Sequence, residues 1–332
     1  MRKVSTVLVA CLLGACAGEH AGTRTSHDAR ADHEARSTIA PGHTNESSAR
    51  RGAIDGSSAW RVVIDGEPEL AFPKVVTTEH SEVKLTFSPD GRRMLWGSTD
   101  RTGGAGAWDI WEVVREGQGW SPPHPVPFNS AGNDFDPSFA PDGSGVYFFS
   151  NRPQGLGGDD VYFVSFRDGT YGEPANLGPH VNSAGDEWGP VVAPDGQHLL
   201  FASDGRGGSG KHDLFWSARR DRGWAPAENL GPDINSERDD FDAAFLHDGR
   251  TLVFASERRG DDRVDLYTSV PSGGRYQAPT WLGATVNSDT TWDFGAAIDP
   301  REPGVFYYNS QRPPNTLGRS DIYRVRYHLA PP

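Results

Sequence analysis

The sequence is poor in the residues that many reactive sites need. Its 332 residues include two cysteines, Cys11 and Cys16, and two methionines, and both cysteines lie close to the N-terminus. The rest of the chain therefore has no internal disulfide, cysteine nucleophile or thiolate metal site. Its stability must come from side-chain packing.

Positive charge is also scarce. The chain has 32 lysines and arginines against 45 aspartates and glutamates, which gives a formal net charge of −13. Binding to nucleic acid requires clustered positive charge, and the sequence contains no basic patch. We therefore expect no nucleic-acid partner.

Several catalytic signatures are missing. The sequence has no Gly-x-Ser-x-Gly nucleophile elbow, no His-Glu-x-x-His zinc motif and no phosphate-binding loop. We therefore predict no catalytic residue and no cofactor, and we expect that the chain is not an enzyme.

The first residues resemble a bacterial lipoprotein signal peptide. Arg2 and Lys3 precede an apolar stretch over residues 4–13, which is too short to span a bilayer, and Leu-Gly-Ala-Cys then ends at Cys16. The resemblance to a lipobox implies that residues 1–15 are removed and that Cys16 carries the acyl chains of a stable anchor. An ordinary secretory signal with a chance cysteine is the alternative.

Residues 16–55 are predicted to form a disordered, lipidated tether. No Phe, Trp or Tyr occurs before Trp60, so the segment cannot bury enough apolar surface to fold. Ala17 follows the cysteine in place of the Asp that retains many lipoproteins at the inner membrane, which favours the outer membrane. The resemblance thus implies a place in the bacterial cell envelope, with the lipid anchor as the membrane contact.

The rest of the chain is repetitive. Asp-Gly pairs begin at residues 90, 142, 195 and 248, and Asn-Ser pairs begin at residues 129, 182, 235 and 287. Both markers recur at intervals of 52 or 53 residues. Two independent markers with one period indicate a repeated supersecondary unit.

Each unit is predicted to contain four strands. In the second copy, a strand over residues 135–140 and a Pro-Asp-Gly turn precede a strand over 146–149 that is apolar on both faces. A third strand over 160–164 and a short edge strand over 174–177 follow. A strand that is apolar on both faces must be covered on both faces, as in the blades of a β-propeller.

The two ends of the repetitive region indicate a closed ring. The last copy stops after its third strand, over residues 321–325, and residues 60–72 could supply the missing outer strand. This pairing would hide the edges of the sheet. We predict an all-β propeller over residues 56–332 with five four-stranded blades, and six blades are the alternative.

The repeat resembles a known family. Pro-Asp-Gly, an apolar strand, Ser-x-Arg, Gly-Gly and Asp-Ile/Leu/Val-Tyr are similar to the WD-repeat-like units of TolB-type propellers, especially those found beside OmpA-like domains in envelope lipoproteins. The segments PANLGPHVNS at 174–183 and PAENLGPDINS at 226–236 strengthen the match. The resemblance implies a propeller over about residues 60–328 but no particular activity, because propellers have many functions.

An arginine follows the second strand in every copy, and an aspartate opens the third strand. These residues are Arg101, Arg152, Arg206, Arg258 and Arg312, and Asp109, Asp160, Asp213, Asp265 and Asp321. An arginine can hold a carboxylate or loop carbonyls. We interpret the set as a structural network within the blades, and five repeated ligand sites are the alternative.

A second ring of acids precedes the first strands. It comprises Glu82, Asp134, Glu187, Asp240 and Asp293, with Trp188 among the adjacent aromatic residues, and Asp136 and Asp242 nearby. If first strands line the axis, these acids form a funnel that could bind a basic partner or Ca²⁺. The alternative is that each acid holds a turn by accepting hydrogen bonds from nearby amides.

Two functions fit these observations. The first is a non-catalytic, monomeric envelope lipoprotein whose propeller binds a protein, a peptide or a cell-wall component at the acidic channel mouth. The second is a propeller glycoside hydrolase or lyase that uses two funnel carboxylates about 5–10 Å apart. The near-equal acids in every copy favour the first function.

Overall fold

A computed structural model describes residues 60–260, 263–312 and 317–331 of the chain. The predicted signal peptide, Cys16 and the tether over 16–55 lie outside these residues. The described residues belong to a compact unit that begins at Ser57. They form strands and loops only, so this part of the chain contains no helix that could cross a membrane.

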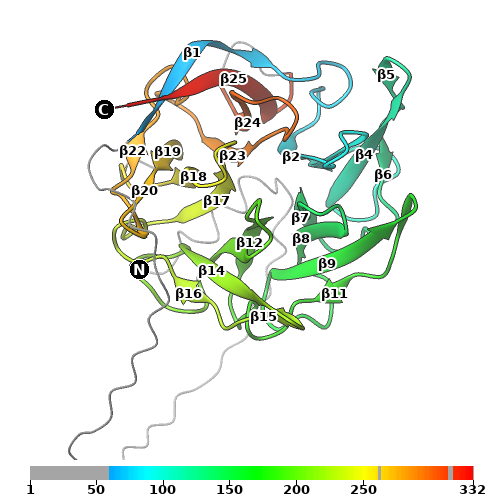
Figure 1. Cartoon of the computed structure of the whole chain (residues 1–332). Helices are drawn as coiled ribbons and strands as arrows, with labels where there is room; N and C mark the ends of the chain where they lie inside the picture. The colour runs from blue at the N-terminus through cyan, green and yellow to red at the C-terminus, as the bar shows by residue number, and fades with distance from the viewer. Residues whose placement is uncertain (1–59, 261–262, 313–316, 332) are drawn as a thin grey trace, which may run out of the picture. The chain divides into compact units, whose positions relative to one another are not determined.

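Five antiparallel sheets form the blades of a β-propeller (Figure 1). Blade 1 contains β2 (Glu82–Phe87), β3 (Arg93–Thr99), β4 (Trp108–Glu116), β5 (Gly119–Trp120) and β6 (His124–Pro125). Blade 2 contains β7 (Asp134–Phe139), β8 (Gly145–Ser150), β9 (Asp160–Arg167), β10 (Thr170–Tyr171) and β11 (Ala175–Asn176). Blade 3 contains β12 (Glu187–Val192), β13 (His198–Ser203), β14 (Asp213–Arg220), β15 (Gly223–Trp224) and β16 (Glu228–Asn229).

The last two blades complete the ring. Blade 4 contains β17 (Asp240–Phe245), β18 (Leu252–Ser256), β19 (Asp265–Ser269) and β22 (Thr280–Trp281), with the small hairpin β20 (Pro271–Ser272) and β21 (Arg275–Tyr276) beside it. Blade 5 contains β23 (Asp293–Ala297), β24 (Val305–Ser310), β25 (Asp321–Ala330) and β1 (Arg61–Leu70). The five-bladed fold is confirmed, and six blades are not formed.

The core lies between neighbouring blades. Every residue of β8 and β24 is buried, as the apolar second strands predicted. One cluster joins Tyr147 and Val161 of blade 2 to Leu199, Phe201 and Phe215 of blade 3. Because full burial of one such side chain contributes about 1.5–3 kcal/mol, the contact between blades is a main source of stability.

The N-terminal strand closes the ring, as expected. β1 pairs antiparallel with β25 from Arg61 opposite Ala330 to Leu70 opposite Tyr323. Figure 1 shows the two strands side by side at the outer edge of blade 5. The start of the propeller is therefore held by its last strand.

The repeated asparagines join consecutive blades. Each side chain accepts a hydrogen bond from a main-chain amide in the preceding blade and donates one to the carbonyl of the same residue. The pairs are Asn129 with Ile110, Asn182 with Val161, Asn235 with Leu214 and Asn287 with Leu266. At the fifth junction Thr77 takes this place, with its hydroxyl 2.6 Å from the carbonyl of Ala71 and 3.4 Å from that of Ile322.

Each first strand contains a β-bulge at its third residue. These residues are Lys84, Asp136, Gly189, Asp242 and Gly295, with φ of 48°, 45°, 55°, 51° and 63°. The register of every first strand shifts at this point. The left-handed conformation is unfavourable for residues other than glycine, so three of the five positions retain a side chain at a cost in stability.

Closure by β1 can be tested by truncation. A chain that starts at residue 71 lacks β1 and exposes the edge of β25, whereas a chain that starts at residue 57 keeps both. We expect the shorter chain to melt at least about 10 °C lower, because a loss of several kcal/mol shifts Tm by about 2–4 °C per kcal/mol in a domain of this size. Equal melting temperatures by circular dichroism would refute closure by this strand.

Candidate functional site

The repeated arginines lie beside the first-strand acids, which the sequence pattern presents as a separate set. Four of the arginines pair with the acid that opens the first strand of their own blade. The ion pairs are Arg101–Glu82 at 2.7 Å, Arg152–Asp134 at 2.5 Å, Arg258–Asp240 at 2.7 Å and Arg312–Asp293 at 3.3 Å. Arg206 differs, because its guanidinium donates to the carbonyls of Pro179, Val181 and Asn182.

The first-strand acids are fully buried and hold the turns before them. Glu82, Asp134, Glu187, Asp240 and Asp293 each have 0% exposure. Each accepts a hydrogen bond from the amide of Thr78, Ser130, Ser183, Ser236 or Ser288, in that order. This geometry matches the turn-holding alternative, and it places none of these acids at an open mouth. A ligand-binding role for this ring stays a prediction without support from the geometry.

Burial raises the pKa of three of these acids, Glu82, Glu187 and Asp293. It raises the pKa of Glu82 to about 8, although Thr78 and Arg101 act in the opposite direction. It raises the pKa of Asp293 to about 6, against hydrogen bonds from Ser288 and Ser310 and the charge of Arg312. The arginines thus compensate only part of the desolvation of the carboxylates.

The third-strand aspartates hold the glycine-rich loops. Asp109, Asp160, Asp213 and Asp321 each accept hydrogen bonds from two loop amides three and four residues earlier. Asp265 forms an ion pair with Arg259 at 3.2 Å. The blade arginines are therefore not the partners of these aspartates, and each polar set stabilises a different loop.

The five bulge positions differ between blades, because two carry glycine and three carry a charged side chain. We call the three charged residues, Lys84, Asp136 and Asp242, the channel triad. Asp136 and Asp242 are both buried. Burial, followed by the charge of Asp242, raises the pKa of Asp136 well above its ordinary value, and Lys84 opposes this shift. Gly189 leaves room for the pair, because a Cβ there would lie 2.8 Å from Oδ1 of Asp242.

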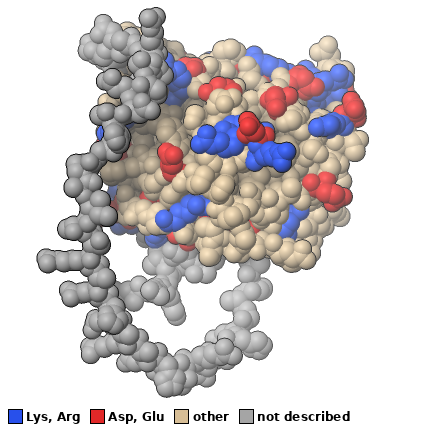
Figure 2. All heavy atoms as spheres, turned by 60° about the horizontal axis from the view of Figure 1, so that its bottom comes forward, with Lys and Arg blue, Asp and Glu red and all other residues tan. Residues whose placement is uncertain are grey.

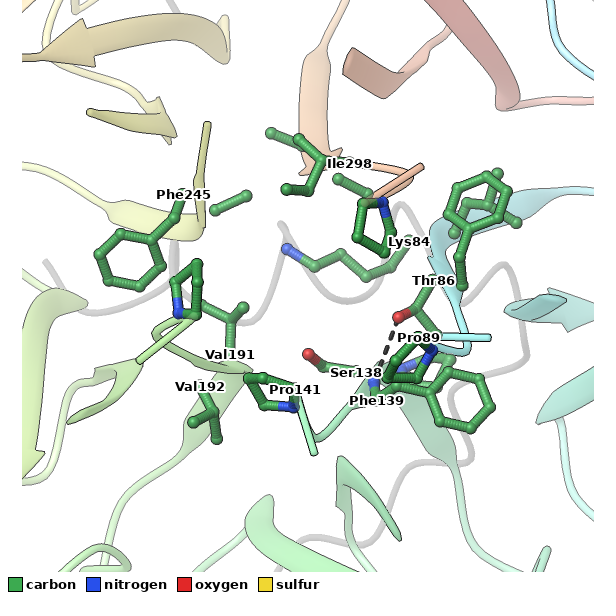
Figure 3. Close-up of a pocket in the computed structure, with 18 residues that line it drawn as sticks. Lys84, Thr86, Pro89, Ser138, Phe139, Pro141, Val191, Val192, Phe245 and Ile298 are labelled. Carbon is green, nitrogen blue, oxygen red and sulfur yellow. Dashed lines mark hydrogen bonds between the residues drawn. The ribbon is translucent and has the colours of Figure 1, made fainter. Parts of the chain in front are cut away.

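A cavity of about 270 Å³ lies where the first strands end. Its lining includes Pro89, Pro141, Val191 and Phe245. Figure 3 shows the side chain of Lys84 reaching across this cavity between apolar residues from several blades. Its Nζ is buried and has no hydrogen-bond partner among the described residues. This end of the channel is therefore mainly apolar, with one ammonium group and the hydroxyls of Thr86 and Ser138.

The opposite face, where the first strands begin, carries a cluster of charged residues from blades 2, 3 and 4. This mouth cluster consists of Asp159, Asp186, Asp204, Lys211, His212, Asp239 and Glu257. On the face that Figure 2 shows, basic and acidic side chains are interspersed, and neither sign covers a continuous area. The mouth cluster combines five acids with one lysine and one histidine.

Close contacts hold the mouth cluster together. Oδ1 of Asp239 lies 2.8 Å from Nδ1 of His212, and its Oδ2 lies 2.9 Å from Nζ of Lys211. Nζ of Lys211 also lies 3.5 Å from Glu257. Nε1 of Trp188 donates to Asp159 at 2.9 Å, and the Trp188 ring stacks on His212 with centroids 3.6 Å apart.

These contacts shift the pKa values of the cluster in opposite directions. Burial raises the pKa of Asp159 to about 6. Burial would also raise the pKa of Asp239, but hydrogen bonds from His212 and Lys211 and the charge of His212 outweigh it and lower the value to about 2. Burial, followed by the charge of Asp239, raises the pKa of Glu257. The cluster thus combines acids with different proton affinities.

Sequence reasoning missed the mouth cluster because it sought residues that recur. In the sequence, each member of the cluster is adjacent to a repeated polar residue, except Lys211, which lies two residues before Asp213. The corresponding positions in blades 1 and 5 carry neither an acid nor a histidine, and their residues are Ser81, Thr99, Ala107, Trp108, Trp292, Gln311, Arg319 and Ser320. An alignment of the five copies, inspected for charges that occur in only some of them, would have revealed the cluster.

Comparisons with known proteins give matches among solved structures alone. No family model matches the chain, and no curated protein does. Among solved structures, TolB from Acinetobacter baumannii is 15% identical, with a TM-score of 0.43, over 75% of this chain and 49% of that chain. This chain thus spans about half of the length of that TolB.

Hydrolases are similar to a comparable degree. The alpha-L-arabinofuranosidase from Podospora anserina is 11% identical, with a TM-score of 0.47, over 81% of this chain and 97% of that chain. A puromycin-hydrolyzing peptidase from Mycobacterium tuberculosis is 13% identical, with a TM-score of 0.41, over 75% and 46%. The five-bladed propeller itself is given by the strand pairing of the described residues.

Loss of one blade arginine should destabilise the fold strongly. Arg152→Met leaves the buried carboxylate of Asp134 without its cation, which typically costs about 3–5 kcal/mol. The double variant Arg152→Met/Asp134→Asn should recover part of the loss, and Arg220→Met, at an exposed site, is the control. Urea unfolding measures the free energies. A loss below about 1 kcal/mol for Arg152→Met would contradict the proposed role of the ion pair.

The channel triad predicts a pH dependence of stability. Because the pKa of Asp136 is raised on folding, the folded state holds a proton that the unfolded state releases above the ordinary value of 3.8. Stability from this group therefore falls as pH rises from 3.8 toward the folded pKa, by at most about 1.4 kcal/mol per pH unit.

Asp136→Asn should reduce the loss of unfolding free energy between pH 5 and pH 8, measured in urea, and Asp221→Asn should not. An unchanged pH dependence in Asp136→Asn would show that Asp136 does not titrate in this range.

Proposed function

We propose that this protein is a non-catalytic binding propeller of the bacterial cell envelope that recruits its partner at the mouth cluster. One observation carries the proposal: the acids and the histidine of the cluster occur in blades 2 to 4 only, whereas the scaffold residues recur around the ring. A binding site for an asymmetric partner requires such a local difference, because equivalent groups in every blade would offer five equal sites.

The charge of the cluster indicates the chemistry of the partner. Five carboxyl groups surround one lysine and one histidine, and Asp204 is exposed. An excess of carboxylate at a protein surface attracts Lys and Arg side chains and accelerates association at low salt. We infer that the partner presents a basic segment, as a protein or a peptide of the envelope.

The geometry gives less support to a glycoside hydrolase. Glycosidases place two carboxyl groups about 5–9.5 Å apart on either side of a sugar. Asp136 and Asp242 are buried, with 7% and 5% exposure, and neither lines the 270 Å³ cavity, so this pair of carboxyl groups is not open to a sugar.

The place in the cell follows from the N-terminal pattern. An acylated Cys16 would attach the propeller to the outer membrane, and residues 17–55 would separate the two. This part of the proposal rests on the sequence, and the propeller would act as a monomer at the end of its tether.

Partner capture tests the proposal. The propeller, as wild type or Asp204→Ala, is immobilised, incubated with envelope extract in the presence of EDTA, and crosslinked. We expect a partner whose capture by the wild type falls with salt and drops at least about fivefold in Asp204→Ala, because a carboxylate that faces the basic segment is lost.

The matched control is Asp221→Ala, which removes an exposed carboxylate from the turn after β14. Equal capture by all three proteins would exclude the mouth cluster as the binding site. Capture that is lost equally in both variants would indicate nonspecific attraction to negative charge.

A further inference from the structure

Three residues of blade 3 meet at one edge of its sheet. Asp186 precedes β12, Asp204 follows β13 and His212 precedes β14, so adjacent antiparallel strands place them side by side. One ligand atom from each lies within 4.8 Å of the other two. Small side-chain rotations would bring these atoms to the separations found around a single metal ion.

His212 provides an independent indication of a ligand. Its side chain is 3% exposed. Nδ1 is occupied by the carboxylate of Asp239 at 2.8 Å, which leaves Nε2 for another partner. Nε2 is buried and has no hydrogen-bond partner among the described residues. A buried ring nitrogen without a partner loses the hydrogen bond that water would provide, so its retention points to a ligand.

Asp239 orients the imidazole in the way that metal sites require. Metal-bound histidines usually place their second ring nitrogen against a carboxylate, which fixes the tautomer and increases the basicity of the coordinating nitrogen. The contact of Asp239 with Nδ1 reproduces this arrangement, and the Trp188 ring stacked on His212 restricts rotation of the imidazole.

Two glycines make room for the carboxylates. A Cβ at Gly158 would lie 2.1 Å from Oδ1 of Asp186, and a Cβ at Gly185 would lie 2.2 Å from Oδ1 of Asp204. These oxygens accept hydrogen bonds from the amides of Asp159 and Asp186, each at 2.8 Å. Both carboxylates are therefore fixed through one oxygen, and the second oxygen of each remains for coordination.

We propose that His212 Nε2, Asp186 and Asp204 bind a divalent transition-metal ion such as Zn²⁺, with Asp239 as the positioning residue for His212. One imidazole and two carboxylates suit zinc, whereas Ca²⁺ and Mg²⁺ prefer ligand sets made of oxygen alone. Because Asp204 is exposed, further coordination positions would be open to water. This inference does not depend on partner binding.

Zinc binding by the purified full-length chain tests the site. We expect isothermal titration with Zn²⁺ alone to detect a one-to-one site that weakens at least about tenfold in His212→Ala and in Asp204→Asn. Because Asp204 is exposed and Asn keeps an acceptor oxygen, that variant should fold normally. His124→Ala, at a half-exposed histidine of blade 1, is the control.

The histidines at 20, 27, 33 and 43 are present in every variant, so any zinc that they bind cancels in the comparison. Equal affinity in the wild type, folded Asp204→Asn and His212→Ala would overturn the proposal. Tighter binding of Ca²⁺ than of Zn²⁺ at the same residues would also overturn the assignment.

The variant Asp239→Asn tests whether Asp239 positions His212 for metal binding or only stabilises the fold. Loss of an outer carboxylate typically weakens metal affinity by 10–100-fold. With Co²⁺ as the probe, the visible absorption of the bound ion should shift in Asp239→Asn and stay unchanged in His124→Ala. An unchanged cobalt spectrum and affinity would remove Asp239 from the site. Because these measurements contain no partner, they remain informative if capture from envelope extract fails.

Discussion

The second strand of every blade is apolar on both faces and cannot remain in contact with water. β8 and β24 are buried along their whole length only because another blade covers each face. This requirement makes every blade depend on two neighbours, and only a ring provides two neighbours for all five. Pairing of β1 with β25 completes that ring without leaving the edge of the last blade exposed.

Within the ring, the repeated polar residues solve a local problem. The long turns between strands carry main-chain amides that need acceptors away from water. Buried acids such as Asp134 supply them, and arginines such as Arg152 compensate the charge. The asparagines then tie each blade to the next. The recurring polar residues therefore stabilise the scaffold, and the proposed binding and metal sites lie at the mouth cluster, whose acids and histidine do not recur in every blade.

The fold could be predicted closely. The Asp-Gly and Asn-Ser markers gave the period, the apolar strands gave the blades, and the missing strand after residue 325 indicated closure by residues 60–72. The pairing of the polar groups could not be predicted. Arg152 and Asp134 are 18 residues apart, and sequence spacing alone does not distinguish Asp134 from Asp160 as the partner of Arg152, because both open strands of the same blade.

The sequence by itself determined the repeat, the strand pattern and the closed ring, because burial of apolar strands is a property of each unit and its neighbours. The tertiary structure alone decided which polar residues are buried, which face each other across blades, and which retain an unsatisfied atom. His212, Asp204 and Asp186 lie next to repeated positions and carry no motif of their own. They meet because antiparallel strands bring their ends to the same edge of a sheet, and that contact exists only in three dimensions.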